Sequence, residues 1–84
     1  MQRTAEEFVH QLPNGRWFVG DFLRTDRDGN EIFLLERRPG VGAVEMRLST
    51  IAIADSGIRT YAAKGSAKRA AQRMIERVLD EDLG

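Results

Sequence analysis

Two turn sequences in the first third of the chain constrain the fold most strongly, because each reverses the backbone between short apolar segments. The first is Pro13-Asn14-Gly15, in which Pro fixes φ near about −65° while Asn and Gly tolerate positive φ. The second spans residues 26–30 and has Asp-Gly at its centre. Apolar segments joined by such turns are typical of antiparallel strands. We therefore expect a sheet built from consecutive hairpins.

The segments between the turns carry strand patterns. Val44, Met46 and Leu48 alternate with polar residues, which is typical of a half-buried strand. Beyond Ser49 the apolar positions change parity, which predicts a bulge or a new strand near residues 49–50. The predicted strands cover residues 16–24, 31–38 and 43–49, with a last short strand at 58–62.

The N-terminal segment permits two interpretations. Thr4 followed by Glu7 matches a helix capping box, which favours a short helix over residues 5–12. The adjacent turn at Pro13 instead favours a hairpin strand over Phe8–Leu12. We expect the strand, because the turn couples this segment closely to the next one.

The C-terminal segment has the periodicity of an amphipathic helix of about four turns that begins near Lys64 or Ser66. Its apolar positions, three and four residues apart, are Ala67, Ala70, Ala71, Met74, Ile75, Val78 and Leu79. We therefore expect one α+β domain over residues 1–84: an antiparallel β-meander of four to five strands with this helix packed on one face.

Composition excludes several classes of function. The 84 residues include no Cys, so neither disulfides nor a Cys-based metal site can form. Thirteen basic and thirteen acidic residues give a formal net charge of zero, unlike a uniformly basic nucleic-acid binder. The longest apolar runs, 32–35 and 51–54, are far shorter than the roughly 20 residues that cross a bilayer. We expect a cytoplasmic protein without membrane contact.

An enzyme is not expected. His10 is the one histidine, and it lies among apolar residues, so we interpret it as structural. The loop that starts at Asp26 fails as a calcium loop, because Glu31 and Arg37 occupy the positions where an EF-hand needs Gly and Glu. No acid, base and nucleophile converge, and we predict no metal and no cofactor.

Charge is sorted within the last third of the chain. Residues 56–75 contain five bases and no acid, whereas residues 76–84 contain four acids and one base. This order opposes the helix macrodipole, which favours acids near the N-terminus. We interpret the bases as a partner-binding surface, and the alternative is an ordinary solvated face. The predicted surface comprises Arg59, Lys64, Lys68, Arg69 and Arg73, with Arg37 and Arg38.

The predicted sheet has more apolar surface than one helix can cover. Both faces of the central hairpin carry large apolar side chains, and a helix about 10 Å across covers about two strands. The second face would then contact the N-terminal segment, a second subunit in a homodimer or a partner protein, unless the sheet curls on itself. The residues predicted for this face are Trp17, Phe18, Phe22 and Phe33.

Two resemblances guide the functional expectation. The run Tyr61-x-x-Lys64-Gly65-Ser66-Ala67-x-x-Ala70-Ala71 resembles the start of the last helix in double-stranded-RNA-binding domains. That resemblance implies that Ser66, Lys68 and Arg69 contact phosphates while the Ala residues pack on a sheet. In size, architecture and charge layout the whole chain is similar to small phage and mobile-element proteins, including anti-CRISPR proteins.

From these observations we expect a non-enzymatic protein that docks on a macromolecular partner. The second resemblance implies an inhibitor of a host nucleoprotein complex, with a protein as the partner. The alternative is a nucleic-acid-binding module that uses the same bases on phosphates.

Overall fold

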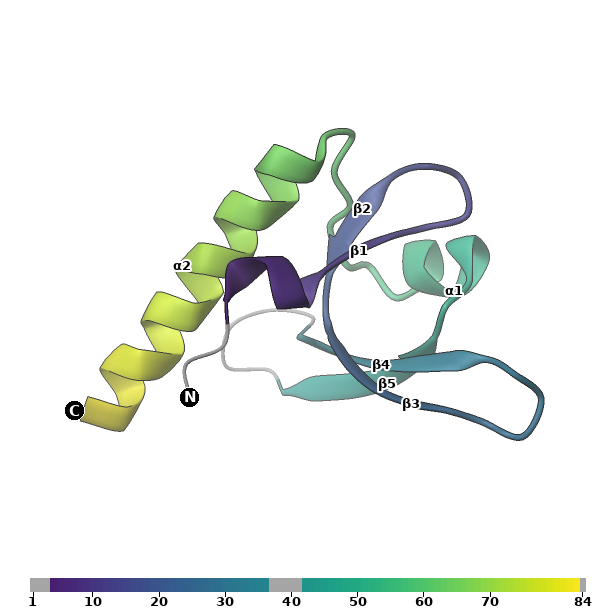
Figure 1. The fold of residues 1–84 in the computed structure, drawn as a ribbon, viewed down its shortest axis with the longest axis horizontal. Helices are drawn as coiled ribbons and strands as arrows, with labels where there is room; N and C mark the ends of the chain where they lie inside the picture. Colours follow the sequence, from purple (N-terminus) through teal and green to yellow (C-terminus); the bar gives the residue numbers. More distant parts are fainter. Residues whose placement is uncertain (1–3, 37–41, 84) are drawn as a thin grey trace.

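Two small antiparallel sheets and two helices make up the described part of the fold, residues 4–36 and 42–83 of a computed structural model (Figure 1). The predicted α+β class is confirmed, but the single meander is wrong, because β1 and β2 form one sheet and β3, β4 and β5 form another. In chain order the elements are the 3-10 turn η1 (Ala5–Phe8), β1 (Val9–Gln11), β2 (Trp17–Val19), β3 (Asp21–Thr25), β4 (Glu31–Glu36), β5 (Ala43–Arg47), α1 (Thr50–Asp55) and α2 (Lys64–Leu83).

Gly20 divides the strand predicted over residues 16–24 into β2 and β3. Its amide donates a hydrogen bond to the Phe8 carbonyl (2.8 Å), and its carbonyl lies 3.0 Å from Nε2 of His10. The backbone of Gly20 is thus bonded to the N-terminal segment while the chain passes from one sheet to the other. A Cβ at this position would overlap Cδ2 of Leu35, so the crossing leaves no room for a side chain.

The N-terminal segment contains both a short helical turn and a strand, so each of the two predicted structures forms in part. Residues Ala5–Phe8 form the 3-10 turn, and β1 follows directly and pairs antiparallel with β2. Thr4 stands at the N-cap in extended conformation, but its side chain makes no capping hydrogen bond. Instead the Glu7 amide donates to the Thr4 carbonyl (3.2 Å). The capping-box sequence therefore marks the start of a short 3-10 turn, not of the helix over residues 5–12.

The second predicted turn is confirmed between β3 and β4. Oδ1 of Asp26 accepts hydrogen bonds from the amides of Asp28 and Asn30, both at 2.9 Å, and Gly29 supplies a φ of +85°. The Asn30 amide bond is also the main cause of the lowered pKa of the Asp26 carboxyl. The carboxylate thus stabilises a polar hairpin. The end of the strand predicted at 37–38 lies outside the described residues.

A helix replaces the bulge or strand predicted near residues 49–50. Ser49 stands in extended conformation at the N-cap of α1, where its Oγ accepts from the Ala52 amide (3.3 Å). The change of parity at Ser49 therefore reflects a change from a period of two to a period of 3.6. Ile53 faces the core with no exposed surface, while Ile51 on the other side is 74% exposed.

The last predicted strand, 58–62, is reduced to one bridge. Tyr61 pairs antiparallel with Trp17, and the two residues exchange amide-to-carbonyl hydrogen bonds of 2.8 Å. Next to this bridge the Arg16 guanidinium donates to Oγ1 and to the carbonyl of Thr60, at 2.8 and 3.0 Å. The segment before α2 is thereby held along β2.

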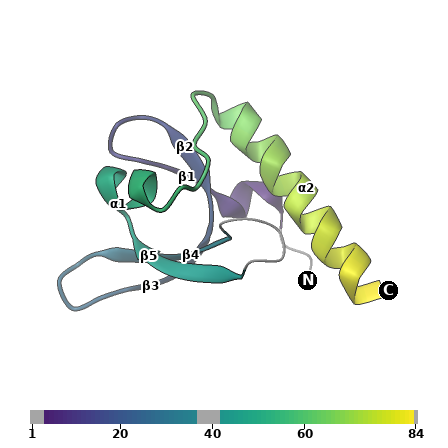
Figure 2. The same cartoon turned by 180° about the vertical axis from the view of Figure 1, so that it is seen from behind.

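The hairpin β1–β2 separates two apolar clusters. The first cluster, between the hairpin, α1 and the three-stranded sheet, comprises Leu12, Phe18, Phe33, Leu35 and Ile53, with Val44, Met46, Leu48 and Ile58 against it. The second lies under α2 and comprises Ala5, Val9, Ala67 and Ala71, with Phe8, Trp17, Val19, Tyr61 and Ile75 against it. Hence α2 packs on η1 and on β1 and β2, the first two strands of the predicted meander, rather than on one face of a single sheet of all the strands (Figure 2).

Candidate binding surface

The first half of α2 presents its basic side chains to solvent while Ala67 and Ala71 are buried. Ala67 and Ala71 have no exposed surface and pack in the second cluster. At 100° per residue, Lys64 and Lys68 then fall on one flank of the helix, and Arg69 and Arg73 fall opposite the buried face. The predicted basic block therefore has two parts, which differ in their surroundings.

The lysine part faces the N-terminal turn. Nζ of Lys64 forms a salt bridge with Oε1 of Glu6 (2.9 Å) and lies 5.7 Å from the centroid of the Trp17 ring. The hydrogen bond and charge of Lys64, together with the charge of Lys68, lower the pKa of the Glu6 carboxyl. Sequence analysis misses this pairing because the two partners are 58 residues apart. Lys64 thus links the first turn of α2 to η1.

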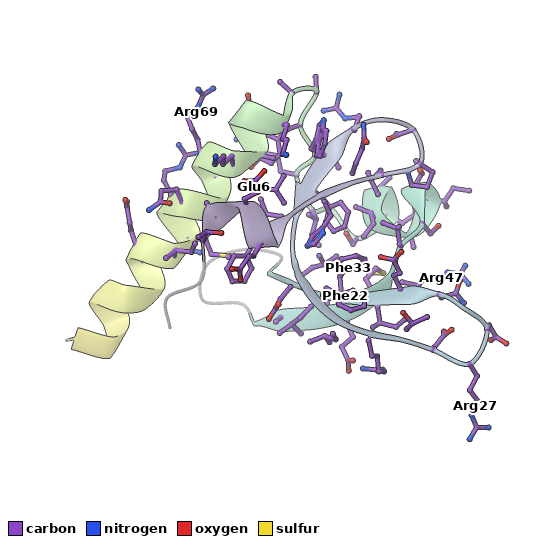
Figure 3. All side chains as sticks on the ribbon, viewed as in Figure 1. Glu6, Phe22, Arg27, Phe33, Arg47 and Arg69 are labelled. Carbon is purple, nitrogen blue, oxygen red and sulfur yellow. The ribbon has the colours of Figure 1, made fainter. Side chains whose placement is uncertain are left out.

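The arginine pair, Arg69 and Arg73, faces outward. Figure 3 shows Arg69 on the outer side of α2, pointing away from the sheets. Its Nη2 atom lies 3.5 Å from Oγ of Ser66, at the limit of a hydrogen bond. Arg73 is exposed and forms no ion pair with any residue that the structure describes. Both guanidinium groups are therefore available for carboxylates or phosphates of another molecule.

The other predicted bases do not join this pair into one described patch. Arg59 precedes α2, and its guanidinium carbon lies 5.5 Å from the centroid of the Tyr61 ring. It is exposed beside the second cluster, before the start of the helix. Arg37 and Arg38 lie outside the described residues. Of the predicted bases, Arg69 and Arg73 thus lie together on the outward side of α2.

Charge along α2 changes sign from its first half to its last turns. Gln72 donates to Oε1 of Glu76 (3.4 Å), and the acids at positions 80–82 follow in sequence. The helix has 20 residues and is therefore about 30 Å long. In both views its last turns extend away from the two sheets (Figures 1 and 2). The sequence of α2 thus has bases in its first half and acids near its end.

The aromatic face predicted for a dimer or partner is not a surface. Phe18 and Phe33 are 0% and 1% exposed and meet edge to face, with ring centroids 5.2 Å apart. Trp17 is half-buried in the second cluster. Of the four residues predicted for this face, Phe22 alone is classed as exposed, at 46%. The chain passes from one sheet to the other at Gly20, and the two clusters bury Phe18 and Phe33 fully and Trp17 in part.

His10 belongs to the aromatic part of the first cluster. Its ring centroid lies 4.6 Å from that of Phe33 and 5.6 Å from that of Phe18. Its Nε2 atom is 3.0 Å from the Gly20 carbonyl, which requires a proton on that nitrogen. Burial lowers the pKa of His10 in spite of that bond and of the charges of Glu31 and Asp21. The histidine thus supports the crossing between the two sheets.

The lowered pKa of His10 predicts acid sensitivity. The unfolded chain, with an ordinary histidine pKa of about 6.5, binds the proton more tightly than the folded protein. The contribution of His10 is therefore complete above about pH 6.5 and is lost as the pH falls through the lowered pKa. We expect His10→Gln, which retains a donor but cannot titrate, to flatten the dependence of unfolding free energy on pH between about 5 and 7. Urea titrations at several pH values measure this dependence. If the variant and the wild type depend on pH equally, groups other than His10 cause the acid sensitivity.

No group of three or more His, Cys, Asp or Glu side chains that could hold a metal ion occurs among residues 4–36 and 42–83. None of the helices within those ranges is long and apolar enough to span a membrane. Comparison with family models, with curated proteins and with solved structures finds no match. The surface is therefore interpreted from its geometry, and the absence of enzymatic activity stays a prediction.

Proposed function

We propose that this chain is a non-enzymatic binding protein that docks on a macromolecular partner through the arginine pair of α2. The observation that carries the proposal is the division of the basic block. Lys64 is bonded to Glu6 within the chain, whereas Arg69 and Arg73 project from the same helix into solvent. The contacts thus distinguish Lys64, which is paired within the chain, from the two arginines, which form no ion pair with a described residue.

A protein partner with an acidic patch fits this surface better than a long duplex. Guanidinium groups bind carboxylates in a bidentate manner. The acids at positions 76 and 80–82 follow the arginine pair along the same helix, and they would repel a phosphate backbone that continued in that direction. Inhibition of a host nucleoprotein complex, which the resemblance to anti-CRISPR proteins implies, is one form of this function and stays a prediction.

The nucleic-acid alternative has one observation in its favour. Ser66, Lys68 and Arg69 lie in the first turns of α2, and the neighbouring Ala67 and Ala71 pack toward β1 and β2. This matches the arrangement that the resemblance to double-stranded-RNA-binding domains implies. Such binding would weaken steeply with salt, with a log–log slope of about −0.9 for each duplex phosphate contacted.

Charge reversal tests the proposal. In capture from a lysate of the source cells, we expect Arg69→Glu to weaken partner binding at least about tenfold, or about 1.4 kcal/mol, and the double variant with Arg73→Glu to abolish it. The matched control is Arg27→Glu at the tip of the β3–β4 hairpin, which makes the same charge change far from α2 (Figure 3). Thermal melting should be unchanged in all three variants, because each altered side chain is exposed.

Two outcomes would contradict the proposal. Equal capture by the wild type and the double variant would show that the arginine pair does not bind the partner. Loss of the captured protein after nuclease treatment, together with direct binding of a duplex of about 20 base pairs at about 50 mM salt, would favour the nucleic-acid alternative, because electrostatic affinity is strongest at low salt.

A further inference from the structure

The outer face of the three-stranded sheet carries two ordered rows of side chains. The register β3–β4–β5 aligns Arg24 with Ile32 and Ile32 with Arg47, so that an apolar residue lies between two bases. The next row on the same face aligns Asp21, Leu34 and Glu45, with an apolar residue between two acids. The register shift at Leu23 is what brings Asp21 and Arg24 to one face of β3. Each row thus has one sign of charge.

This face is exposed and lies opposite the first cluster. Phe33, Leu35, Val44 and Met46 point from β4 and β5 into that cluster, and the residues between them point outward. Of the two apolar residues at its centre, Leu34 is 36% exposed and Ile32 is half-buried. The side chains of Arg24 and Glu45 are 58% and 53% exposed, and they meet across β4 at 2.6 Å. An apolar centre between charged margins is typical of an interface.

We propose that two copies of this chain pack through this outer face, related by a two-fold axis that runs across the strands midway between the two rows. Such an axis lays the acidic row of one copy over the basic row of the other and keeps the order of the strands. Glu45 of each copy, which also pairs with Arg24 of its own chain, then faces Arg47 of the second copy, and Leu34 faces Ile32. A closed dimer of this kind is isologous, so each contact occurs twice.

Charge complementarity identifies a second copy as the occupant. A partner protein would need an acidic row and a basic row at the spacing of two residues along a strand, and this chain itself supplies that pattern. Two sheets packed face to face lie about 10 Å apart with strands within about 30° of each other, which the proposed axis allows. The inference is independent of α2 and of the proposed function.

The size of the face sets the expected strength of the dimer. Three strands of about five residues cover roughly 14 by 17 Å. This is smaller than the roughly 800 Å² that each partner buries in a standard stable interface. We therefore expect at most a weak, reversible dimer that is populated only at high protein concentration.

A charge swap between two variants tests the proposal. In Arg47→Glu the two copies oppose acid to acid, and in Glu45→Arg they oppose base to base, so we expect each variant alone to dimerise at least about tenfold more weakly. In an equimolar mixture, the first variant is acidic at both positions 45 and 47, and the second is basic at both. Each mixed dimer therefore opposes an acid to a base at both contacts. We expect the mixture to recover the wild-type constant within about threefold, as measured by sedimentation equilibrium at about 20–500 µM.

Two further variants keep the test decisive. Arg27→Glu makes the same charge change as Arg47→Glu but lies at the hairpin tip, so its dimerisation should equal that of the wild type (Figure 3). Leu34→Lys alters the exposed apolar centre and should leave the protein folded and monomeric, even if Glu45→Arg fails to fold. A wild type that stays monomeric at about 500 µM, or a mixture that fails to recover, would overturn the proposal, and so would equal weakening by Arg27→Glu and Arg47→Glu.

Discussion

Phe18→Ala is expected to lower the free energy of unfolding by about 3–5 kcal/mol. The side chain has no exposed surface, and its ring meets that of Phe33 at a centroid distance of 5.2 Å in the first cluster. A chain of 84 residues has a total stability of only about 4–13 kcal/mol. The loss therefore corresponds to a fall in melting temperature of about 12–40 °C. The measurement is urea or thermal unfolding followed by the fluorescence of Trp17, the single tryptophan of the chain.

The matched variant is Phe22→Ala, which removes the same side chain from the same aromatic group. The Phe22 ring lies 5.6 Å from that of Phe33 but remains 46% exposed, so its removal leaves no closed cavity. We expect a loss of about 1 kcal/mol or less. Similar losses for the two variants would mean that Phe18 is not a core residue. The interpretation of these aromatics as an intermolecular face would then return.

Local signals in the sequence predict most of the secondary structure. Pro13-Asn14-Gly15 and the Asp26–Asn30 segment each carry the chemistry of a tight turn, and both turns form. The buried positions Ala67 and Ala71 recur at helical spacing, so α2 is confirmed from its own residues. In these segments local preference and tertiary packing favour the same structure, so turn residues and periodicity are sufficient to predict the secondary structure.

The rest depends on contacts between residues far apart in sequence. In the sequence, nothing distinguishes Gly20 from the other residues of an aromatic strand. Only the structure shows that the chain passes between two sheets there and that Leu35 leaves no room for a side chain. Thr50, Ile51 and Ile53 have the propensity of strand residues. In the structure they nevertheless belong to a helix, α1, which places Ile53 in the first cluster. Five strands form, within the predicted four to five, but they are divided between two sheets, which the sequence analysis does not predict.

In the candidate site, too, the order of charges is visible in the sequence, whereas contacts between distant residues are not. Sorting of charge along residues 56–84 is visible in the sequence and indicates where a partner would bind. The partner of Lys64 within the chain, Glu6, is not visible, because the contact forms only when η1 packs on α2. The two charged rows of the outer sheet face likewise require the register shift at Leu23.

Gly20→Ala is expected to destabilise the fold by about 1–3 kcal/mol, the usual cost of an added methyl group in a closely packed site. Gly20 does not adopt a positive φ, so its backbone would accept alanine, and the effect is steric. The new Cβ would overlap Cδ2 of Leu35 and lie 3.3 Å from the Phe18 ring. Because Leu35 has no exposed surface, its side chain has little space into which to move.

Two comparisons isolate this contact from the general effect of replacing glycine. Gly65→Ala in the first turn of α2 places its Cβ in open space, so it should be neutral or stabilise by up to about 1 kcal/mol. Leu35→Val removes the atom that the new Cβ would meet. In a double-mutant cycle we expect Gly20→Ala to cost at least about 0.5 kcal/mol less in the Leu35→Val background than in the wild type. Additive losses would show that the space beside Leu35 is not what requires glycine where the chain crosses between the two sheets.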